Sequence, residues 1–203
     1  MSTEIEPKMY MEMAFKAAQN STCARRRVGA VIVSPTGDIV SAGWNHGSTG
    51  ISCESKFFAE YVKDKYPETA ELQQYLVALQ EAPLIAHGYE KYLSPELSSF
   101  WESFKIYTKT PEFKAVHKKW QDTEIHSELT AILNAYKLGK SVSNCILYSS
   151  RSPCVACAHA IIESGISCCY YTELSVAGEG GIPILEKAGI KVIHLPIETE
   201  YYT

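Results

Sequence analysis

The feature that most constrains this chain is a pair of short motifs whose side chains suit one metal ion. Residues 124–128 read Glu-Ile-His-Ser-Glu, and residues 152–157 read Ser-Pro-Cys-Val-Ala-Cys. A catalytic zinc typically takes three protein ligands from histidine, cysteine or carboxylate side chains and leaves a fourth position for water. The two motifs together offer one imidazole and two thiols, namely His126, Cys154 and Cys157. A fold that unites them can therefore hold a zinc ion of the catalytic type.

Each motif stands at the start of a predicted helix. A helix is predicted over residues 127–139 and a second one over residues 154–164, with a strand over residues 142–149 between them. The apolar positions at i, i+3, i+4 and i+7 of the first helix are Leu129, Ile132, Leu133 and Tyr136. The two cysteines lie three residues apart and so share a face of the second helix. Because the first turn of a helix favours anionic groups and thiolates, both helix starts can aim ligands at one metal.

A carboxylate accompanies the candidate ligands. Glu128 follows His126 by two residues, and we expect it beside the open metal position, where it can carry protons. A His-x-Glu motif alone has little specificity, and a Cys-x-x-Cys motif alone also suits half of a structural zinc site or a redox pair. Both motifs in this order, with Pro153 before the first cysteine and a helix after each, favour a catalytic centre over a purely structural one.

Composition limits the size, location and partners of the protein. The chain has 203 residues, of which 46% are hydrophobic, and this is enough for one α/β domain with a hydrophobic core. Its net charge of -4 makes it a poor general binder of polynucleotides, and we expect no stable nucleic-acid partner. Residues 1–20 contain no apolar run long enough for a signal peptide or a membrane span. Seven cysteines without a secretion signal indicate a reducing compartment, so we expect a cytoplasmic protein with no membrane partner.

The rest of the chain predicts an α/β order that one long segment interrupts. The other predicted elements are a helix at 7–20, strands at 28–33 and 39–44, a strand at 167–172, a helix at 182–188 and a strand at 190–195. Together with the motif region they predict a mixed sheet flanked by helices. Residues from about 55 to 120 instead predict short helices, each entered at or near a proline. We therefore predict a single domain, residues 1–203, with a helical insertion at about 55–120. The insertion would contribute to packing or to subunit contacts, and the alternative is a lid over the substrate.

With these elements in place, the chain resembles the deoxycytidylate (dCMP) deaminases of the phage, T-even-like type, within the cytidine deaminase superfamily. The segments that carry the resemblance are residues 28–33, 43–45, 124–133, 152–157 and 188–190. The metal motifs mark the superfamily, and the Gly-Trp-Asn segment with the extended middle marks the dCMP branch. The resemblance implies a three-layer cytidine deaminase-like fold with a mixed five-stranded sheet.

The resemblance also implies the hydrolytic deamination of dCMP to dUMP, which supplies dTMP synthesis. Zinc on His126, Cys154 and Cys157 would activate water, and Glu128 would move the protons. Family members bind the base through backbone groups beside the ligands and the sugar 3′-hydroxyl through an asparagine. The matching residues here are Ser127, Ser152 and Asn45. Tyr171 is a further candidate for packing on the base or sugar, and a half-buried strand tyrosine is the equal alternative.

Phage-type dCMP deaminases carry a second zinc, and the resemblance extends to its ligands. The matching residues are Cys23, Cys53, His117 and Glu124. Two thiols, an imidazole and a carboxylate can close a tetrahedral structural site. His87 is the alternative to His117, because the spacing before the catalytic motif departs slightly from the family pattern.

Regulation and assembly are implied as well. Relatives are hexamers that dCTP activates and dTTP inhibits, and magnesium would accompany the effector nucleotide. The residues that match the effector site by family position are Arg26, Arg27, Asn45, Gly47, Gly50 and Lys137. The loop at residues 43–50 lacks the proline of the family pattern and contains an additional histidine, and Lys137 replaces an arginine of a phage relative. These departures leave open whether regulation is retained. A phage-encoded protein of this kind would act in the host cytoplasm.

Three other functions share part of this evidence. A polynucleotide or tRNA deaminase would need a basic, aromatic-lined groove, and the acidic composition argues against it. A deaminase of dCTP or of a free nucleoside is the closer competitor, because the sequence displays no distinct phosphate clamp. A non-catalytic, zinc-stabilised interaction module is the third function, and the presence of Glu128 argues against it.

Overall fold

The computed structural model describes residues 7–21, 23, 27–47, 109–111, 124–175 and 178–197. Contacts between residues divide the chain into two compact units. The first unit contains residues 1–21, 27–45 and 125–203, and the second contains residues 22–26 and 46–124. The helical insertion expected at about 55–120 belongs to the second unit and lies almost entirely outside the described residues, so it stays a prediction.

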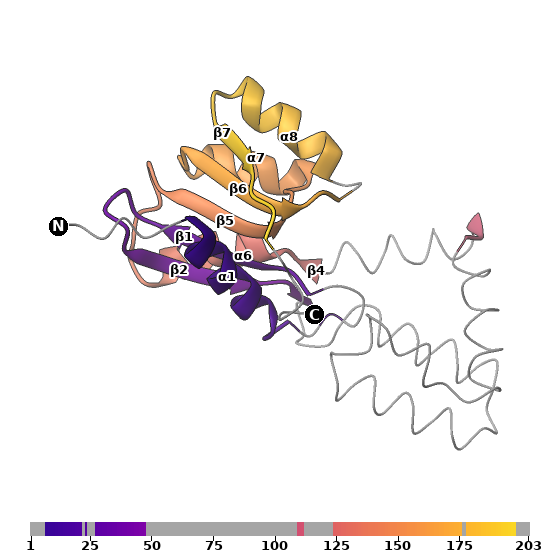
Figure 1. The fold of residues 1–203 in the computed structure, drawn as a ribbon, viewed down its shortest axis with the longest axis horizontal. Helices are drawn as coiled ribbons and strands as arrows, with labels where there is room; N and C mark the ends of the chain where they lie inside the picture. The colour runs from indigo at the N-terminus through magenta and orange to yellow at the C-terminus, as the bar shows by residue number, and fades with distance from the viewer. Residues whose placement is uncertain are drawn as a thin grey trace, which may run out of the picture. The chain divides into compact units, whose positions relative to one another are not determined.

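A mixed five-stranded sheet forms the centre of the first unit (Figure 1). Its strands are β1 (Gly29–Val33), β2 (Ile39–Trp44), β5 (Ile146–Arg151), β6 (Cys168–Glu173) and β7 (Lys191–His194). They lie in the order β2-β1-β5-β6-β7. β1 pairs antiparallel with β2 and β5, whereas β5, β6 and β7 are parallel to one another. The mixed five-stranded sheet that the sequence predicts is thereby confirmed.

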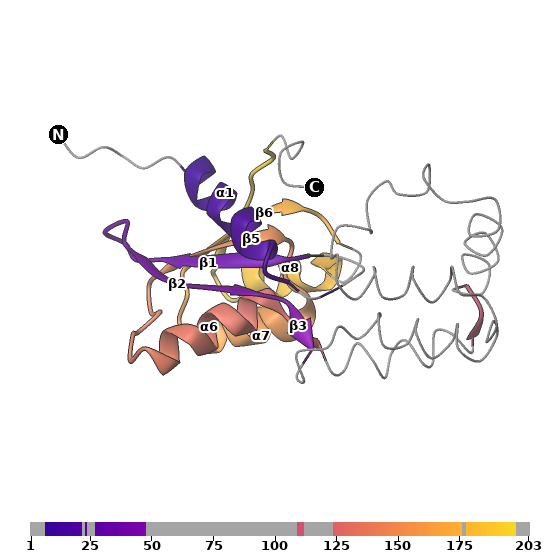
Figure 2. The same ribbon diagram turned by 90° about the horizontal axis from the view of Figure 1, so that it is seen from below.

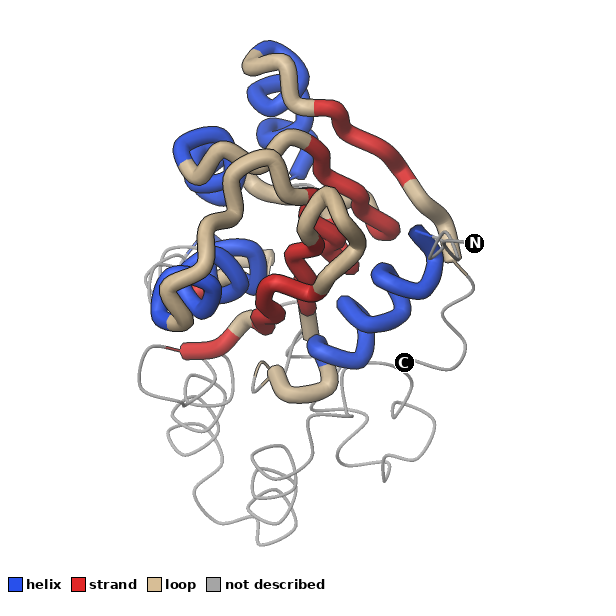
Figure 3. Tube along the Cα trace, turned by 90° about the vertical axis from the view of Figure 1, so that its left-hand side faces the viewer, coloured by secondary structure: helices blue, strands red, loops and turns tan. Residues whose placement is uncertain are grey.

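Helices cover both faces of this sheet. Those that the structure describes are α1 (Pro7–Ala18), α6 (Ser127–Lys137), α7 (Val155–Glu163) and α8 (Gly178–Lys187). α1 packs on one face, and α6, α7 and α8 pack on the opposite face (Figures 2 and 3). The result is the three-layer α/β/α arrangement that the resemblance implies.

Alternate residues of β1 show why the sheet carries helices on both faces. All five residues of this strand are buried. Val31 and Val33 belong to the hydrophobic cluster under α1, whereas Ala30 and Ile32 belong to the cluster under α6, α7 and α8. Side chains alternate between the faces of a strand, so a strand buried on both faces is apolar throughout.

Small residues allow α6 to lie directly on β2. A Cβ atom on Gly43 would meet backbone atoms of α6, among them Ala131 N and the carbonyl oxygen of Ser127. Ala131 and Ala135 are fully buried on the same side of the helix. Ser41 Oγ adds a hydrogen bond of 2.8 Å to the Ala131 carbonyl oxygen. The small residues of the two elements therefore let α6 pack closely on β2.

Three features differ from the prediction made from the sequence. The strand expected at 142–149 begins only at Ile146, because the chain first makes a turn with Asn144 at φ 59°. The helix expected from residue 182 begins earlier, at Gly178. A small two-stranded sheet, which the sequence does not predict, is formed by β3 (His46–Gly47) and β4 (Glu124–Ile125).

Candidate active site

The N-termini of α6 and α7 present the candidate metal ligands. His126 is the N-cap of α6, with φ -74° and ψ 156°, and Cys154 is the N-cap of α7, with φ -75° and ψ 173°. Their carbonyl oxygens accept the first helical hydrogen bonds, from the N–H of Thr130 at 2.9 Å and of Ala158 at 2.8 Å. Neither side chain makes a capping hydrogen bond. The backbone of each residue therefore begins a helix, while its side chain takes no part in capping and can act as a metal ligand.

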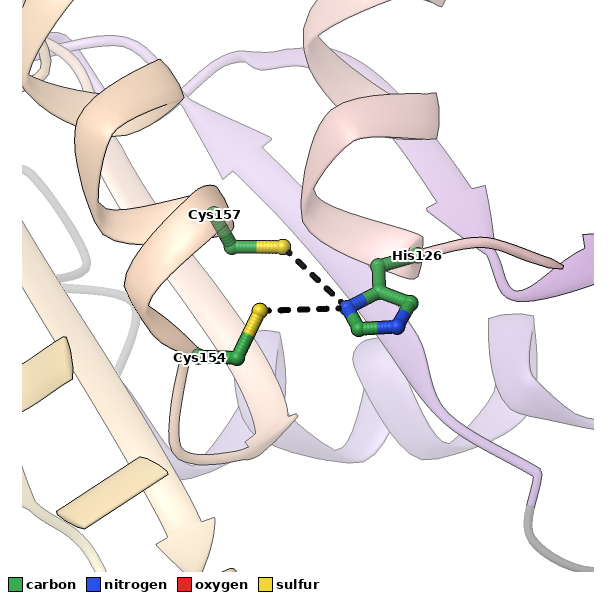
Figure 4. A group of neighbouring side chains, drawn as sticks. All are labelled: His126, Cys154 and Cys157. Carbon is green, nitrogen blue, oxygen red and sulfur yellow. Dashed lines mark hydrogen bonds between the residues drawn. The ribbon is translucent and has the colours of Figure 1, made fainter. Parts of the chain in front are cut away.

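The three candidate ligands converge on one point (Figure 4). Their ligand atoms all lie within 4.8 Å of one another. Nδ1 of His126 is 3.4 Å from Sγ of Cys154 and 3.4 Å from Sγ of Cys157. In a tetrahedral zinc site with bonds of ordinary length, an imidazole nitrogen and a thiolate sulfur are about 3.6 Å apart. The donor set and its spacing therefore fit a zinc ion, and in the described part of the chain these three side chains leave a fourth position for another ligand.

Hydrogen bonding gives the two cysteines opposite protonation states. The pKa of Cys154 is lowered to about 3, chiefly by its hydrogen bond with Cys157 and also by His126. The pKa of Cys157 is raised well above its ordinary value by the same hydrogen bond and by burial. Without a metal, one thiolate and one thiol share a proton at this site. Zinc binding would release that proton, because the thiolate is the form that binds metals.

A buried carboxylate stands beside the ligands. Glu128 is 4% exposed, and its Oε2 atom lies 3.7 Å from Sγ of Cys157. The hydroxyl of Ser127 donates a hydrogen bond of 2.9 Å to the same oxygen. Burial raises the pKa of the Glu128 carboxyl group. A carboxyl group beside a metal site is placed to accept a proton and to return it.

The turn that carries Cys154 is attached to the end of β6. The backbone N–H of Ser152 donates to the carbonyl oxygen of Glu173 at 2.8 Å, and its Oγ accepts a hydrogen bond of 2.9 Å from the N–H of Ser175. Ser152 is itself buried. These bonds fix the loop between β5 and α7, and the expected contact of Ser152 with the base stays a prediction.

Asn45 belongs to the framework of the first unit. It is 5% exposed, and its carboxamide oxygen accepts hydrogen bonds from Ser21 Oγ at 2.7 Å and from the N–H of Val28 at 2.8 Å. The residue thereby connects the segment after α1 with the start of β1 and the end of β2. Its expected contact with the sugar 3′-hydroxyl stays a prediction.

Tyr171 packs within the sheet layer. It is half-buried in β6, and its ring stacks on that of His194 with centroids 5.1 Å apart and an interplanar angle of 30°. Its packing on a base or sugar stays a prediction.

Only part of the expected second zinc site lies among the described residues. Cys23 is buried, and Glu124 is half-buried in β4. Cys53, His117 and the alternative His87 lie outside the described residues. The second metal site therefore stays a prediction.

The residues expected at an effector site are also described in part. Arg27 is half-buried and donates a hydrogen bond of 3.3 Å to the carbonyl oxygen of Gln19, and burial lowers the pKa of its guanidinium. Lys137 is exposed at the end of α6, and Gly47 is buried in β3. Arg26 and Gly50 lie outside the described residues. The effector site stays a prediction.

Two buried hydroxyl groups are not anticipated by the sequence. The side chain of Ser127 binds Glu128, whereas the resemblance implies a role only for its backbone. Ser149 in β5 is fully buried, and its Oγ has no hydrogen-bond partner in the described part of the chain. The sequence shows a hydroxyl residue between the metal ligand and the carboxylate, but it does not show that the side chains of Ser127 and Glu128 meet. No sequence pattern indicates the unpaired hydroxyl of Ser149, because a strand pattern does not show which buried polar atoms find partners.

The fold and the site together define a zinc-binding deaminase. Residues 5–173 match the family model of the cytidine and deoxycytidylate deaminase zinc-binding region. The chain therefore belongs to this family. Its membership confirms the predicted fold class, the zinc cofactor and the assignment as a hydrolytic enzyme.

Two phage proteins of this family resemble most of the chain. It is 33% identical to the deoxycytidylate deaminase of Enterobacteria phage T2 over 189 residues, which are 92% of this chain and 90% of the phage protein. It is 32% identical to the deoxycytidylate deaminase of Enterobacteria phage T4, over 92% of this chain and 88% of that protein. The resemblance to phage-type dCMP deaminases is thereby confirmed.

A solved structure shares the fold. The dCMP deaminase of the cyanophage S-TIM5, in complex with dCMP and dUMP, superposes with a TM-score of 0.56 at 20% identity, over 94% of this chain and 99% of that chain. No helix in the described part of the chain has the length and apolar character that crossing a bilayer requires.

Proposed function

We propose that the protein removes the exocyclic amino group of dCMP by hydrolysis, giving dUMP and ammonia. The observation that carries this proposal is the 33% identity to the T2 deoxycytidylate deaminase over 92% of the chain. The site supports it, because three side chains suited to zinc and one buried carboxylate meet at the starts of two helices. The product dUMP would supply dTMP synthesis.

The residues of the site divide the chemistry between them. His126, Cys154 and Cys157 would hold zinc, which lowers the pKa of water in its fourth coordination position. Glu128 accepts the proton of the attacking water, delivers it to N3 of the cytosine ring and then assists the departure of ammonia. The burial of Glu128 supports these transfers, because it raises the pKa of the carboxyl group and so makes the carboxylate a better proton acceptor.

Ammonia release from cytidine, dCMP, dCTP and single-stranded oligonucleotides tests the substrate. We expect dCMP to give the highest kcat/KM of the panel. A preference for dCTP or cytidine would replace the proposed substrate within the same chemistry. Activity confined to oligonucleotides would make the protein a polynucleotide deaminase, which the net charge of -4 opposes.

A zinc-stabilised interaction module without activity is the alternative from another class of function. The buried position of Glu128 argues against it, because burying a carboxyl group costs free energy that a purely structural zinc site has no need to spend. Zinc-loaded protein that releases no ammonia from any nucleotide of the panel would favour the module.

We further propose a second, structural zinc ion bound by Cys23, Cys53, His117 and Glu124. The match of these four residue types to the ligands of phage-type dCMP deaminases supports it. Metal analysis should give two zinc ions per chain for the wild type and one for Cys23→Ser. One zinc ion per wild-type chain would remove this site. Comparison of His117→Ala with His87→Ala identifies which histidine is the ligand.

We also propose that the enzyme is a homo-oligomer, a hexamer, that dCTP with magnesium activates and dTTP inhibits, and that it acts in the cytoplasm of a host cell. The similarity to proteins of two phages supports the host location. Leu133 and Tyr136, which are 43% and 82% exposed on α6, support subunit contacts there. The molar mass in solution and rate curves with each effector test these proposals. A hyperbolic curve that neither nucleotide changes would exclude the regulation.

A further inference from the structure

The side chain of Ser127 makes an uncommon contact within α6. Ser127 is the first residue of the helix, is 0% exposed and stands between His126 and Glu128. Its Oγ atom donates a hydrogen bond of 2.9 Å to Oε2 of Glu128. Consecutive residues of a helix point in different directions and do not normally pair. The contact therefore depends on a short hydroxyl side chain at this position.

A second side chain also donates to the same oxygen in the metal-free site. Sγ of Cys157 lies 3.7 Å from Oε2 of Glu128. A cysteine gives up its proton when it becomes a zinc ligand, and a thiolate cannot donate a hydrogen bond. Of the two side-chain hydrogen bonds that Oε2 accepts from described residues, only the one from Ser127 is therefore compatible with a zinc-loaded site.

We infer that Ser127 is a positioning residue whose hydroxyl holds the Glu128 carboxylate in the orientation from which it exchanges protons. The inference rests on the proposed deamination. A glutamate side chain has three rotatable bonds, and a group that transfers protons must stay within hydrogen-bond reach of the reacting atoms. This role uses the hydroxyl alone and is separate from the backbone contact with the base that the resemblance implies.

The Ser127→Ala variant removes the hydroxyl and leaves the backbone in place. We expect kcat for dCMP to fall about 10- to 100-fold, the range for a lost hydrogen bond to a charged group, with KM and zinc content unchanged. In a Glu128→Gln background the same substitution should cause no further loss, because Ser127 acts through Glu128. A further loss in that background would show that Ser127 acts by another route.

Ser41→Ala is the matched control. The hydroxyl of Ser41 is also buried and also binds α6, through its hydrogen bond of 2.8 Å to the carbonyl oxygen of Ala131. Both variants lose one buried hydrogen bond, so both should lower the melting temperature, and only Ser127→Ala should lower kcat. If Ser127→Ala is less stable but keeps the wild-type kcat, Ser127 is merely structural and the inference is wrong.

Crystal structures of the zinc-loaded wild type and of zinc-loaded Ser127→Ala give a readout that does not depend on activity. We expect Glu128 in one rotamer in the wild type and in a different rotamer, or in several, in the variant. An unchanged single rotamer in the variant would overturn the inference. If the wild type does not deaminate dCMP, the proposed function fails, and the comparison of rotamers still decides whether Ser127 positions Glu128.

Discussion

At both helix starts of the site, a metal ligand occupies the position where proteins usually place serine, threonine, aspartate or asparagine. His126 and Cys154 are N-caps without a capping hydrogen bond. The absence of a capping hydrogen bond lowers the stability of each of these two helices by about 1 kcal/mol. In return, the N–H groups of the first turn and the positive end of the helix dipole face the site, where they favour thiolate ligands.

The first residue-scale prediction concerns the proton carrier. Glu128→Gln keeps the size of the side chain but cannot accept a proton, so kcat for dCMP should fall about 10²- to 10⁴-fold. Zinc content should stay at the wild-type value, because Glu128 is not a ligand in the proposed site. Steady-state kinetics with metal analysis on the same sample checks both points. Unchanged turnover would remove Glu128 from the mechanism.

The same substitution should change how the stability of the metal-free protein depends on pH. Burial raises the pKa of Glu128 in the folded state, so the folded protein binds more protons than the unfolded chain between the two pKa values. The contribution of Glu128 to stability must therefore fall as the pH rises from the unfolded-state pKa through the folded-state pKa. Urea unfolding across this interval should give a difference in stability, wild type minus Glu128→Gln, that falls as the pH rises. Parallel curves would contradict the prediction.

The orphan hydroxyl of Ser149 gives a prediction of increased stability. A buried hydroxyl without a partner costs roughly 1–3 kcal/mol, so Ser149→Ala should stabilise the protein by about 1 kcal/mol after the loss of packing is included. Ser150→Ala is the control, because Ser150 is equally buried but its Oγ accepts a hydrogen bond of 3.1 Å from the N–H of Gly29. The control should be destabilised in urea unfolding. Destabilisation of both variants alike would show that Ser149 has a partner.

At the scale of elements, α6 shows what the sequence can and cannot predict. The spacing of its large apolar residues predicts the helix correctly, yet Leu133 and Tyr136 are 43% and 82% exposed. The side packed on the sheet is made of small residues, Ala131 and Ala135, both at 0% exposure. Periodicity identifies a helix, but the face that is buried depends on how closely a neighbour approaches. Here Gly43 in β2 permits an approach that only small side chains fit.

The start of α8 could not be predicted for a similar reason. The glycines at 178, 180 and 181 have low helix propensity and therefore predict a loop, yet they lie in the first turns of the helix. A Cβ atom on Gly181 would meet the carbonyl oxygen of Pro153 and backbone atoms of Cys154. Packing against the metal-binding turn thus overrides local propensity. The positions of the ligands were predictable because both motifs precede helices, whereas the contact of Ser127 with Glu128 depends on side-chain geometry that no motif encodes.

The contact between β2 and α6 gives the prediction at this scale. Gly43→Ala would place a Cβ atom against backbone atoms of α6, 2.6 Å from the carbonyl oxygen of Ser127. Overpacking against the backbone should cost about 1–3 kcal/mol and move the start of α6, so zinc affinity should fall as well. Gly180→Ala is the control, because its Cβ would meet only the end of the Val155 side chain. Equal zinc affinity in both variants would contradict the proposed displacement.

At the scale of the whole first unit, the metal site connects two halves of the sheet. α6 packs mainly on β1 and β2, which form the antiparallel half, whereas α7 packs with α8, which contacts β7 in the parallel half. The ligands come from both helices, one from α6 and two from α7. Bound zinc would therefore couple the two halves in addition to its role in catalysis.

This coupling predicts a stability that depends on zinc and on pH. A free zinc concentration of 100 Kd stabilises a protein by about 2.7 kcal/mol, which corresponds to about 5–10 °C in melting temperature for a chain of this size.

Zinc binding should release about one proton from the cysteine pair near neutral pH, because Cys154 is already ionised and Cys157 is not. The apparent affinity should therefore rise about tenfold per pH unit, rather than a hundredfold as for two protons. Calorimetry in buffers of different ionisation enthalpy counts the protons.

A pair of cysteine variants tests which residues hold the zinc. Cys154→Ser should abolish the rise in melting temperature that zinc causes at this site, whereas Cys168→Ser, at a half-buried thiol of β6, should keep it. Release of two protons, or an increment that survives Cys154→Ser, would show that the ligands are not held as the structure describes.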